Sequence, residues 1–126
     1  MLSEGDTFLT ADDDEELHLW IVITSPAEGE VVTVSVTTRR KKSESLVLLK
    51  QGDHPFIVHD SVVAYSYARI RAVDDIETAF LNGTAKRREP VSQELLARIK
   101  TGLVDSDFTP NGVRHYFKSV TEKTDQ

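Results

Sequence analysis

The sequence contains no cysteine among its 126 residues, which excludes disulfide bonds and metal sites built on thiolates. It also lacks any apolar run near the roughly 18 residues that a membrane-spanning helix needs, so we expect no membrane partner. Residues 1–16, MLSEGDTFLTADDDEE, have neither the basic start nor the apolar block of a secretory signal peptide. Together these absences favour a cytoplasmic protein.

Glycine and proline are also scarce, with six and four residues respectively. No stretch rich in glycine, proline or serine divides the chain, and no segment repeats another. The length is typical of one domain with its own core, and the hydrophobic and charged contents of 39% and 29% are ordinary for a globular protein. We therefore expect a single domain that spans residues 1–126.

Positive charge is missing from the first thirty residues, which hold nine of the 21 acidic side chains. The rest of the chain carries all fifteen basic residues against twelve acidic ones, although the net charge of the whole protein is −6. Two basic runs stand out, residues 39–42 (RRKK) and 86–88 (KRR). Such runs permit contact with a polyanion, because the local field matters more than the total charge. Solvated loop tips are the alternative interpretation.

Strand patterns dominate the first seventy residues. Residues 17–24 form an almost continuous apolar run, which predicts a strand buried on both faces, and residues 31–38 alternate valine with hydroxyl residues. The acidic residues 12–16 between the first two strands predict a loop, because five adjacent carboxylates repel one another. The complete set of predicted strands is 6–10, 17–24, 31–38, 46–49, 56–58 and 61–65, and residues 67–73 either continue the sheet or begin the exit from it.

Helix patterns follow after residue 73. We predict helices near residues 75–82, 92–102 and 109–120, the second capped by Ser92 and the third opened by Pro110. Strands followed by helices indicate the α+β class. The predicted architecture is a small barrel of about five or six strands in the first 70 residues, covered by C-terminal helices.

Short motifs follow one another in a distinctive order along the chain. They are Gly5-Asp6, the apolar strand 18–24, the strand 31–38 with its terminal hydroxyl pair, Ser61-Val62-Val63 leading to Ala72-Val73-Asp74, Gly83-Thr84, and the helix start Val91-Ser92-Gln93-Glu94-Leu95. From residue 5 to residue 103 this order resembles the PemK/MazF-like fold, an SH3-like barrel known from bacterial toxins that cut RNA without a metal. The fragments HPFI, DSVV and YARI look more like an uncharacterised branch of phage and bacterial proteins.

The resemblance implies a site, a substrate and partners. It implies RNA as the substrate, no cofactor, an antitoxin or other protein partner, and a homodimer. Toxins of this kind place an arginine before a proline at the start of the second strand, where this chain has His18-Leu19. Their catalytic hydroxyl follows the third strand, where Thr37 or Thr38 stands. Their first loop is basic, whereas residues 12–16 would repel a phosphate backbone.

Metal-free cleavage of RNA needs a base, an acid and a cation for the charge that develops on the phosphate. Histidine suits both proton roles because either of its forms exists near neutral pH. Arginine can bind the phosphate, and tyrosine can stack on a base. The predicted catalytic residues are therefore His18, Thr37, His54 and His59, and the predicted substrate-binding residues are Arg39, Tyr65, Tyr67 and Arg69.

Each of these residues also has a structural interpretation. His18 can bond a backbone carbonyl, His54 can serve a turn after Gly52-Asp53, and His59 can stand at a bend between strands. The two tyrosines share a face that is more often core than binding platform. His115 belongs to the surface of the last helix. A metal site built from Asp53, His54, His59 and Asp60 is a further alternative, but its spacing matches no known motif, so we predict no metal.

Three hypotheses of function follow from the sequence. The one favoured by the acidic loop and by His18 in place of an arginine is a non-catalytic barrel that binds a protein partner or nucleic acid. The second is a metal-independent, toxin-like endoribonuclease of a toxin–antitoxin system, favoured by the set of histidine, threonine and arginine residues. The third is a metal-dependent hydrolase.

Overall fold

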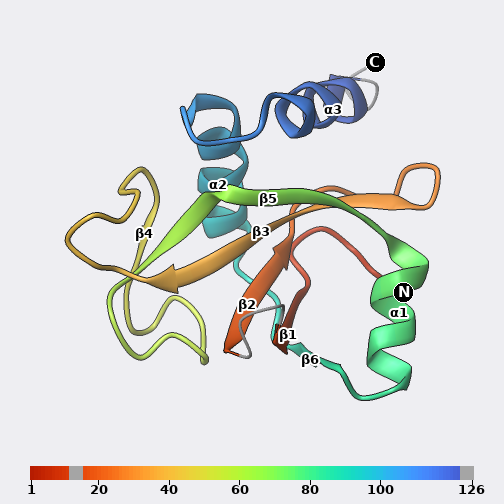
Figure 1. Cartoon of the computed structure of the whole chain (residues 1–126), viewed down its shortest axis with the longest axis horizontal. Coiled ribbons are helices and arrows are strands. Elements are labelled where there is room, and N and C mark those ends of the chain that lie inside the picture. The colour runs from red at the N-terminus through yellow and green to blue at the C-terminus, as the bar shows by residue number, and fades with distance from the viewer. Residues whose placement is uncertain (12–15, 123–126) are drawn as a thin grey trace.

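The computed structural model describes residues 1–11 and 16–122 of the chain (Figure 1). Residues 12–15 of the predicted acidic loop lie outside the described residues. The elements in chain order are β1 (Thr7–Ala11), β2 (Leu17–Val22), β3 (Glu30–Thr38), β4 (Leu48–Leu49), β5 (Ser61–Ala72), α1 (Val73–Leu81), β6 (Ala85–Arg88), α2 (Gln93–Asp105) and α3 (Asn111–Glu122).

The strands form one curled antiparallel sheet in the order β4-β5-β3-β2-β1-β6. Its longest pair joins β3 and β5, and the register of this pair shifts between Thr33 and Ser35. Opposite this irregularity, the carboxylate of Glu44 accepts hydrogen bonds from the backbone N–H groups of Tyr65 and Ser66, at 2.9 and 3.2 Å. Glu44 thereby satisfies backbone donors that a regular ladder would have paired, and β5 can bend without ending.

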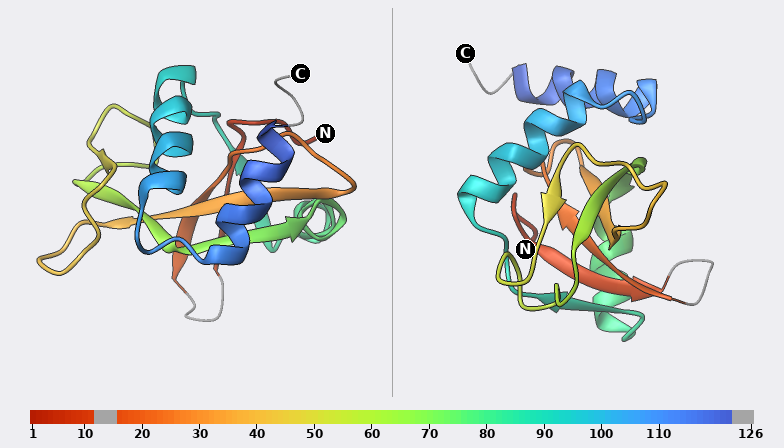
Figure 2. Two further views of the ribbon diagram at one scale, coloured as in Figure 1. Left: turned by 90° about the horizontal axis from the view of Figure 1, so that it is seen from above. Right: turned by 90° about the vertical axis from the view of Figure 1, so that its left-hand side faces the viewer.

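Apolar side chains fill both faces of the sheet. One core lies beneath α2 and α3 and includes Leu19, Ile21 and Ile99. The other lies beneath α1 and includes Trp20 and Val22. Neighbouring residues of β2 thus enter different cores, because successive side chains of a strand point to opposite faces. This confirms the prediction that the second strand is buried on both faces, and Figure 2 shows α2 and α3 together on one side of the sheet.

The three predicted helices are confirmed, with ends that differ by a few residues. Ser92 caps α2 as expected, since its hydroxyl oxygen accepts a hydrogen bond from the N–H of Leu95 at 3.1 Å. α2 continues to Asp105, beyond the predicted end at residue 102, and α3 runs from Asn111 to Glu122. No helix in residues 1–11 and 16–122 is both long enough and apolar enough to cross a bilayer.

One strand prediction is wrong, and one strand of the structure was not predicted. Residues 56–58, which the structure does describe, form a loop rather than a strand, although the side chain of Ile57 is buried in the core. The second basic run, residues 86–88, belongs to strand β6, which pairs with β1. The strand is compatible with its charges because it lies at the sheet edge, where Ala85 faces the core and Arg87 reaches the carboxylate of Asp6 at 3.0 Å. The curled sheet therefore extends to residue 88 rather than ending near residue 73.

Candidate active site

A pocket of about 240 Å³ opens at one end of the sheet, where β2 begins, β3 ends and β5 begins. We call it the histidine pocket. Its polar lining consists mainly of His18, Thr37, Thr38, Arg40, His59 and Ser61. Three of the four residues predicted to be catalytic are thus brought together, namely His18, Thr37 and His59.

Strand register explains why these residues meet. Leu19 of β2 pairs with Val36 of β3. The next residues toward this end of the sheet, His18 and Thr37, therefore lie side by side on the two neighbouring strands. Thr38 in turn pairs with Ser61 at the start of β5. The hydroxyl of Ser61 donates to the backbone carbonyl of His59 at 2.8 Å, which holds the exposed His59 beside the strand ends.

Apolar side chains form part of the pocket rim. Leu17 and Val58 line it and are 58% and 59% exposed, and the half-buried ring of Phe56 lies in the same wall. Together these side chains give the rim an exposed apolar surface that a ligand can cover. The pocket therefore combines groups that can exchange protons with apolar surface that can contact a flat base.

Arg40, rather than the predicted Arg39, supplies the cation of the histidine pocket. A turn sets its position, because the N–H of Arg40 donates to the hydroxyl of Ser43 at 2.7 Å and the N–H of Ser43 donates to the carbonyl of Arg40 at 3.0 Å. Arg39 lines a neighbouring pocket instead. Sequence reasoning missed Arg40 because two adjacent arginines give no signal of which one faces the site.

His54 lies apart from the histidine pocket, and its contacts match the structural interpretation of this residue. Its ring is 3% exposed and both of its nitrogens are used. Nε2 donates to the carbonyl of Glu89 at 2.6 Å, and Nδ1 accepts from the N–H of Phe56 at 3.0 Å. This pattern requires the neutral tautomer with its proton on Nε2. The ring therefore ties the loop that carries Phe56 and His59 to the segment after β6.

The two tyrosines that were predicted to bind substrate lie in different environments. Tyr65 is fully buried, and its hydroxyl donates to the carbonyl of Ile99 at 2.8 Å. Burial, followed by the charge of Glu44, raises the pKa of this hydroxyl above its ordinary value. No face of the Tyr65 ring is accessible to a base in this structure. Tyr67 is 60% exposed, but it does not line the histidine pocket.

Arg69 is also outside the histidine pocket. Its guanidinium lies 5.2 Å from the centroid of the Trp20 ring, and that of Arg71 lies 4.2 Å from the same centroid. These cation–π contacts place both arginines over a core aromatic residue. Arg69 also lines a separate pocket of about 270 Å³ beside α1.

The predicted metal alternative has no cluster to support it. In residues 1–11 and 16–122, no three histidine, aspartate or glutamate side chains are grouped closely enough to hold a metal ion. His54, one of the four residues considered, has both ring nitrogens engaged with the backbone. His115 is exposed on α3, as predicted.

Two solved structures of MazE-MazF from Deinococcus radiodurans are similar to this chain. Form II aligns with a TM-score of 0.55 and 16% identity, and covers 82% of this chain and 92% of that chain. Form III aligns with a TM-score of 0.53 and 16% identity, and covers 82% and 94%. No protein-family model and no curated protein sequence matches the chain. The chain thus has a MazF/PemK-like fold, which confirms the predicted fold and class.

Proposed function

We propose that this protein is a metal-independent endoribonuclease that acts through the histidine pocket. One observation carries the proposal, which is the convergence of His18, His59, Thr37 and Arg40 in a single pocket of a MazF/PemK-like fold. The sequence alone favours a non-catalytic barrel, because the arginine of the toxin pattern is missing from the start of β2. Arg40 offers a guanidinium in the same pocket from the end of β3, which reverses that preference.

The proposed reaction uses the RNA 2′-hydroxyl as the nucleophile. One imidazole of the His18–His59 pair takes the proton from this hydroxyl, and the 2′-oxygen attacks the adjacent phosphorus. The bond from phosphorus to the 5′-oxygen breaks, and the other imidazole protonates that oxygen. The products are a 2′,3′-cyclic phosphate and a free 5′-hydroxyl, so atoms and protons balance without water or a metal.

Arg40 and Thr37 stabilise the phosphate in this scheme. Negative charge on the two non-bridging oxygens grows as the 2′-oxygen attacks, and a guanidinium presents paired N–H donors to such oxygens. The hydroxyl of Thr37 adds a further donor at the strand end. Leu17, Val58 and Phe56 offer the base an apolar surface on the rim of the same pocket.

A protein partner of the antitoxin kind fits the same proposal. The two similar structures are both of MazE-MazF, and this chain covers more than nine tenths of the chain it matches in each. We expect such a partner to bind over the mouth of the histidine pocket, because the exposed Leu17 and Val58 lie there.

Binding without cleavage is the second candidate function. Glu16 lines the histidine pocket, and a carboxylate beside the phosphate position opposes binding of RNA. In that case the pocket would hold a nucleic acid weakly or serve a protein partner alone.

The test is cleavage of a mixed-sequence RNA pool by purified protein in the presence of a chelator. We expect His18→Ala and His59→Ala to lower the cleavage rate by roughly a hundredfold or more each, which is the usual contribution of a general acid or base. His115→Ala is the matched control, because it removes an exposed imidazole from α3. The fragments should carry 2′,3′-cyclic phosphate and 5′-hydroxyl ends. Wild-type protein that binds RNA without cutting it would establish the second candidate instead.

A further inference from the structure

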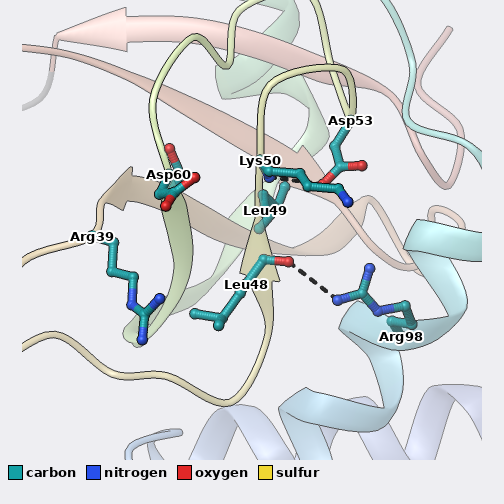
Figure 3. A pocket seen from close by; sticks show the side chains of 8 residues that line it. Arg39, Leu48, Leu49, Lys50, Asp53, Asp60 and Arg98 are labelled. Atoms are coloured by element: carbon teal, nitrogen blue, oxygen red, sulfur yellow. Dashed lines mark hydrogen bonds between the residues drawn. The ribbon is translucent and has the colours of Figure 1, made fainter.

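A second pocket, of about 400 Å³, shares Ser61 with the histidine pocket. Figure 3 shows side chains that line it. We call it the arginine pocket. Its lining includes three cationic side chains and two carboxylates, from Arg39, Lys50, Arg98, Asp53 and Asp60. Leu48 and Leu49 of β4 form its apolar wall. Figure 3 shows Arg39 and Arg98 on opposite sides of Leu48.

The three cationic side chains keep N–H donors that can bind a ligand. Arg98 is oriented by one hydrogen bond, from Nη2 to the carbonyl of Leu48 at 3.1 Å, and its other N–H groups keep their donor capacity. The side chains of Arg39 and Lys50 are exposed and form no ion pair or hydrogen bond with any residue in 1–11 or 16–122. Such cations can meet an anionic ligand without first breaking a contact.

The two carboxylates offset part of this positive charge. Asp53 has a local task, since its carboxylate accepts the N–H of Lys50 at 2.8 Å while its own N–H donates to the carbonyl of Lys50 at 3.0 Å. Asp60 is exposed, and its backbone carbonyl accepts the N–H of Arg39 at 2.9 Å. Three cations against two carboxylates leave one net positive charge, which matches the single negative charge of a phosphodiester.

The two pockets are continuous along the chain. Ser61 lines both of them. Two pairs of adjacent residues are shared between the pockets. Arg39 and Asp60 line the arginine pocket, and their chain neighbours Arg40 and His59 line the histidine pocket. A single strand of RNA held at the histidine pocket therefore has the arginine pocket directly beside it.

We propose that the arginine pocket binds the phosphate of the nucleotide next to the one cleaved, through Arg39, Lys50 and Arg98. This inference rests on the proposed endoribonuclease function and adds to it a second contact with the RNA chain. The wall formed by Leu48, which is partly exposed, lies against the sugar or base of that nucleotide. The subsite contributes to binding, and the reaction itself stays with the histidine pocket.

The test compares Arg39→Ala/Lys50→Ala with wild type in RNA cleavage at several salt concentrations. We expect KM to rise about tenfold with kcat within about twofold, because the lost contacts act on binding and not on the reacting atoms. The slope of log affinity against log salt should fall by about 0.7, the value for one phosphate of a single strand. Lys86→Ala/Lys118→Ala is the matched control, since it removes two exposed charges from β6 and α3 and should change neither quantity.

Each other outcome overturns the proposal in a recognisable way. If wild type cuts RNA and the Arg39→Ala/Lys50→Ala variant keeps its KM and salt slope, the subsite is wrong while the proposed function stands. If the control weakens binding equally, the effect is a general field and no subsite exists. If the variant loses only a protein partner, the pocket belongs to that partner. If wild type neither binds nor cuts RNA, the proposed function fails and the subsite fails with it.

Discussion

Replacement of His54 by alanine should unfold the loop around it without removing a catalytic group. The substitution deletes the acceptor for the N–H of Phe56 and one of two donors to the carbonyl of Glu89. That carbonyl keeps a partner, because the hydroxyl of Thr7 also donates to it at 2.7 Å. The N–H of Phe56 loses the hydrogen bond that His54 supplies.

The expected magnitude follows from these contacts. A buried donor without a partner costs about 1–3 kcal/mol, and the lost bond to Glu89 adds about 1 kcal/mol. We therefore expect His54→Ala to lower the free energy of unfolding by about 2–4 kcal/mol. His54→Asn should recover part of this loss, because its side-chain oxygen can accept the N–H of Phe56 as in a common turn.

Urea denaturation followed by circular dichroism measures this difference, and RNA cleavage is measured on the folded variants below their transitions. Thr7→Val provides a matched control, because it removes the other donor to Glu89 and the 3.3 Å contact between the Thr7 hydroxyl and His54 Nε2. The bonds from His54 to Glu89 and Phe56 stay in place. We expect that control to cost about 1 kcal/mol. Our reasoning is refuted if His54→Ala is as stable as wild type, or if folded His54→Asn is as inactive as His59→Ala.

Two further predictions concern the contact between β5 and α2. Gly102→Ala should destabilise the protein by about 1–3 kcal/mol, although alanine favours helix, because the new Cβ would lie 2.2 Å from the Tyr65 hydroxyl and 2.8 Å from Val47 Cγ2. Thermal unfolding measures the loss, and an unchanged or raised Tm would contradict the packing. Because the folded pKa of Tyr65 is raised, the unfolded chain releases this proton first. The contribution of Tyr65 to the free energy of unfolding should therefore be constant below pH 10 and fall by up to about 1.4 kcal/mol per pH unit above it. Urea titrations from pH 8 to 11 should show a shallower fall in Tyr65→Phe, and identical slopes would refute the assignment.

Local patterns in the sequence were sufficient for the central strands and the helices. β2 was predicted from its continuous apolar run, and β3 from its strict alternation of valine and hydroxyl residues, because both patterns indicate which side chains are buried. β6 was not predictable in this way, since its partner β1 lies about eighty residues earlier and its three cations resemble a solvated loop. The sequence left open whether β5 continues beyond Tyr65, because the alternation breaks at Ser66 and Tyr67, where the register of the β3–β5 pair shifts.

The same distinction applies to the site. His18 and Thr37 could be placed together from the sequence because both stand at strand ends that an antiparallel sheet brings side by side. The burial of His54 could not be predicted from the residues next to it in the sequence. The carbonyl that binds its ring belongs to Glu89, 35 residues further along the chain. The choice between Arg39 and Arg40 depended on the turn closed by Ser43, which a run of basic residues conceals.

The bond between His54 and Glu89 also bears on the order in which a growing chain acquires its structure. Once residue 72 has been synthesised, β2, β3 and β5 can already pair, since all three precede that point. The loop that carries His59 cannot be tied down through His54 until Glu89 has been added. Closing a contact between residues distant in the sequence carries an entropic cost that local pairing avoids. The nascent protein therefore pairs the strands that wall the histidine pocket first and ties the loop that carries His59 to Glu89 only when β6 has emerged. A chain truncated before residue 89 should carry the pocket residues without their arrangement.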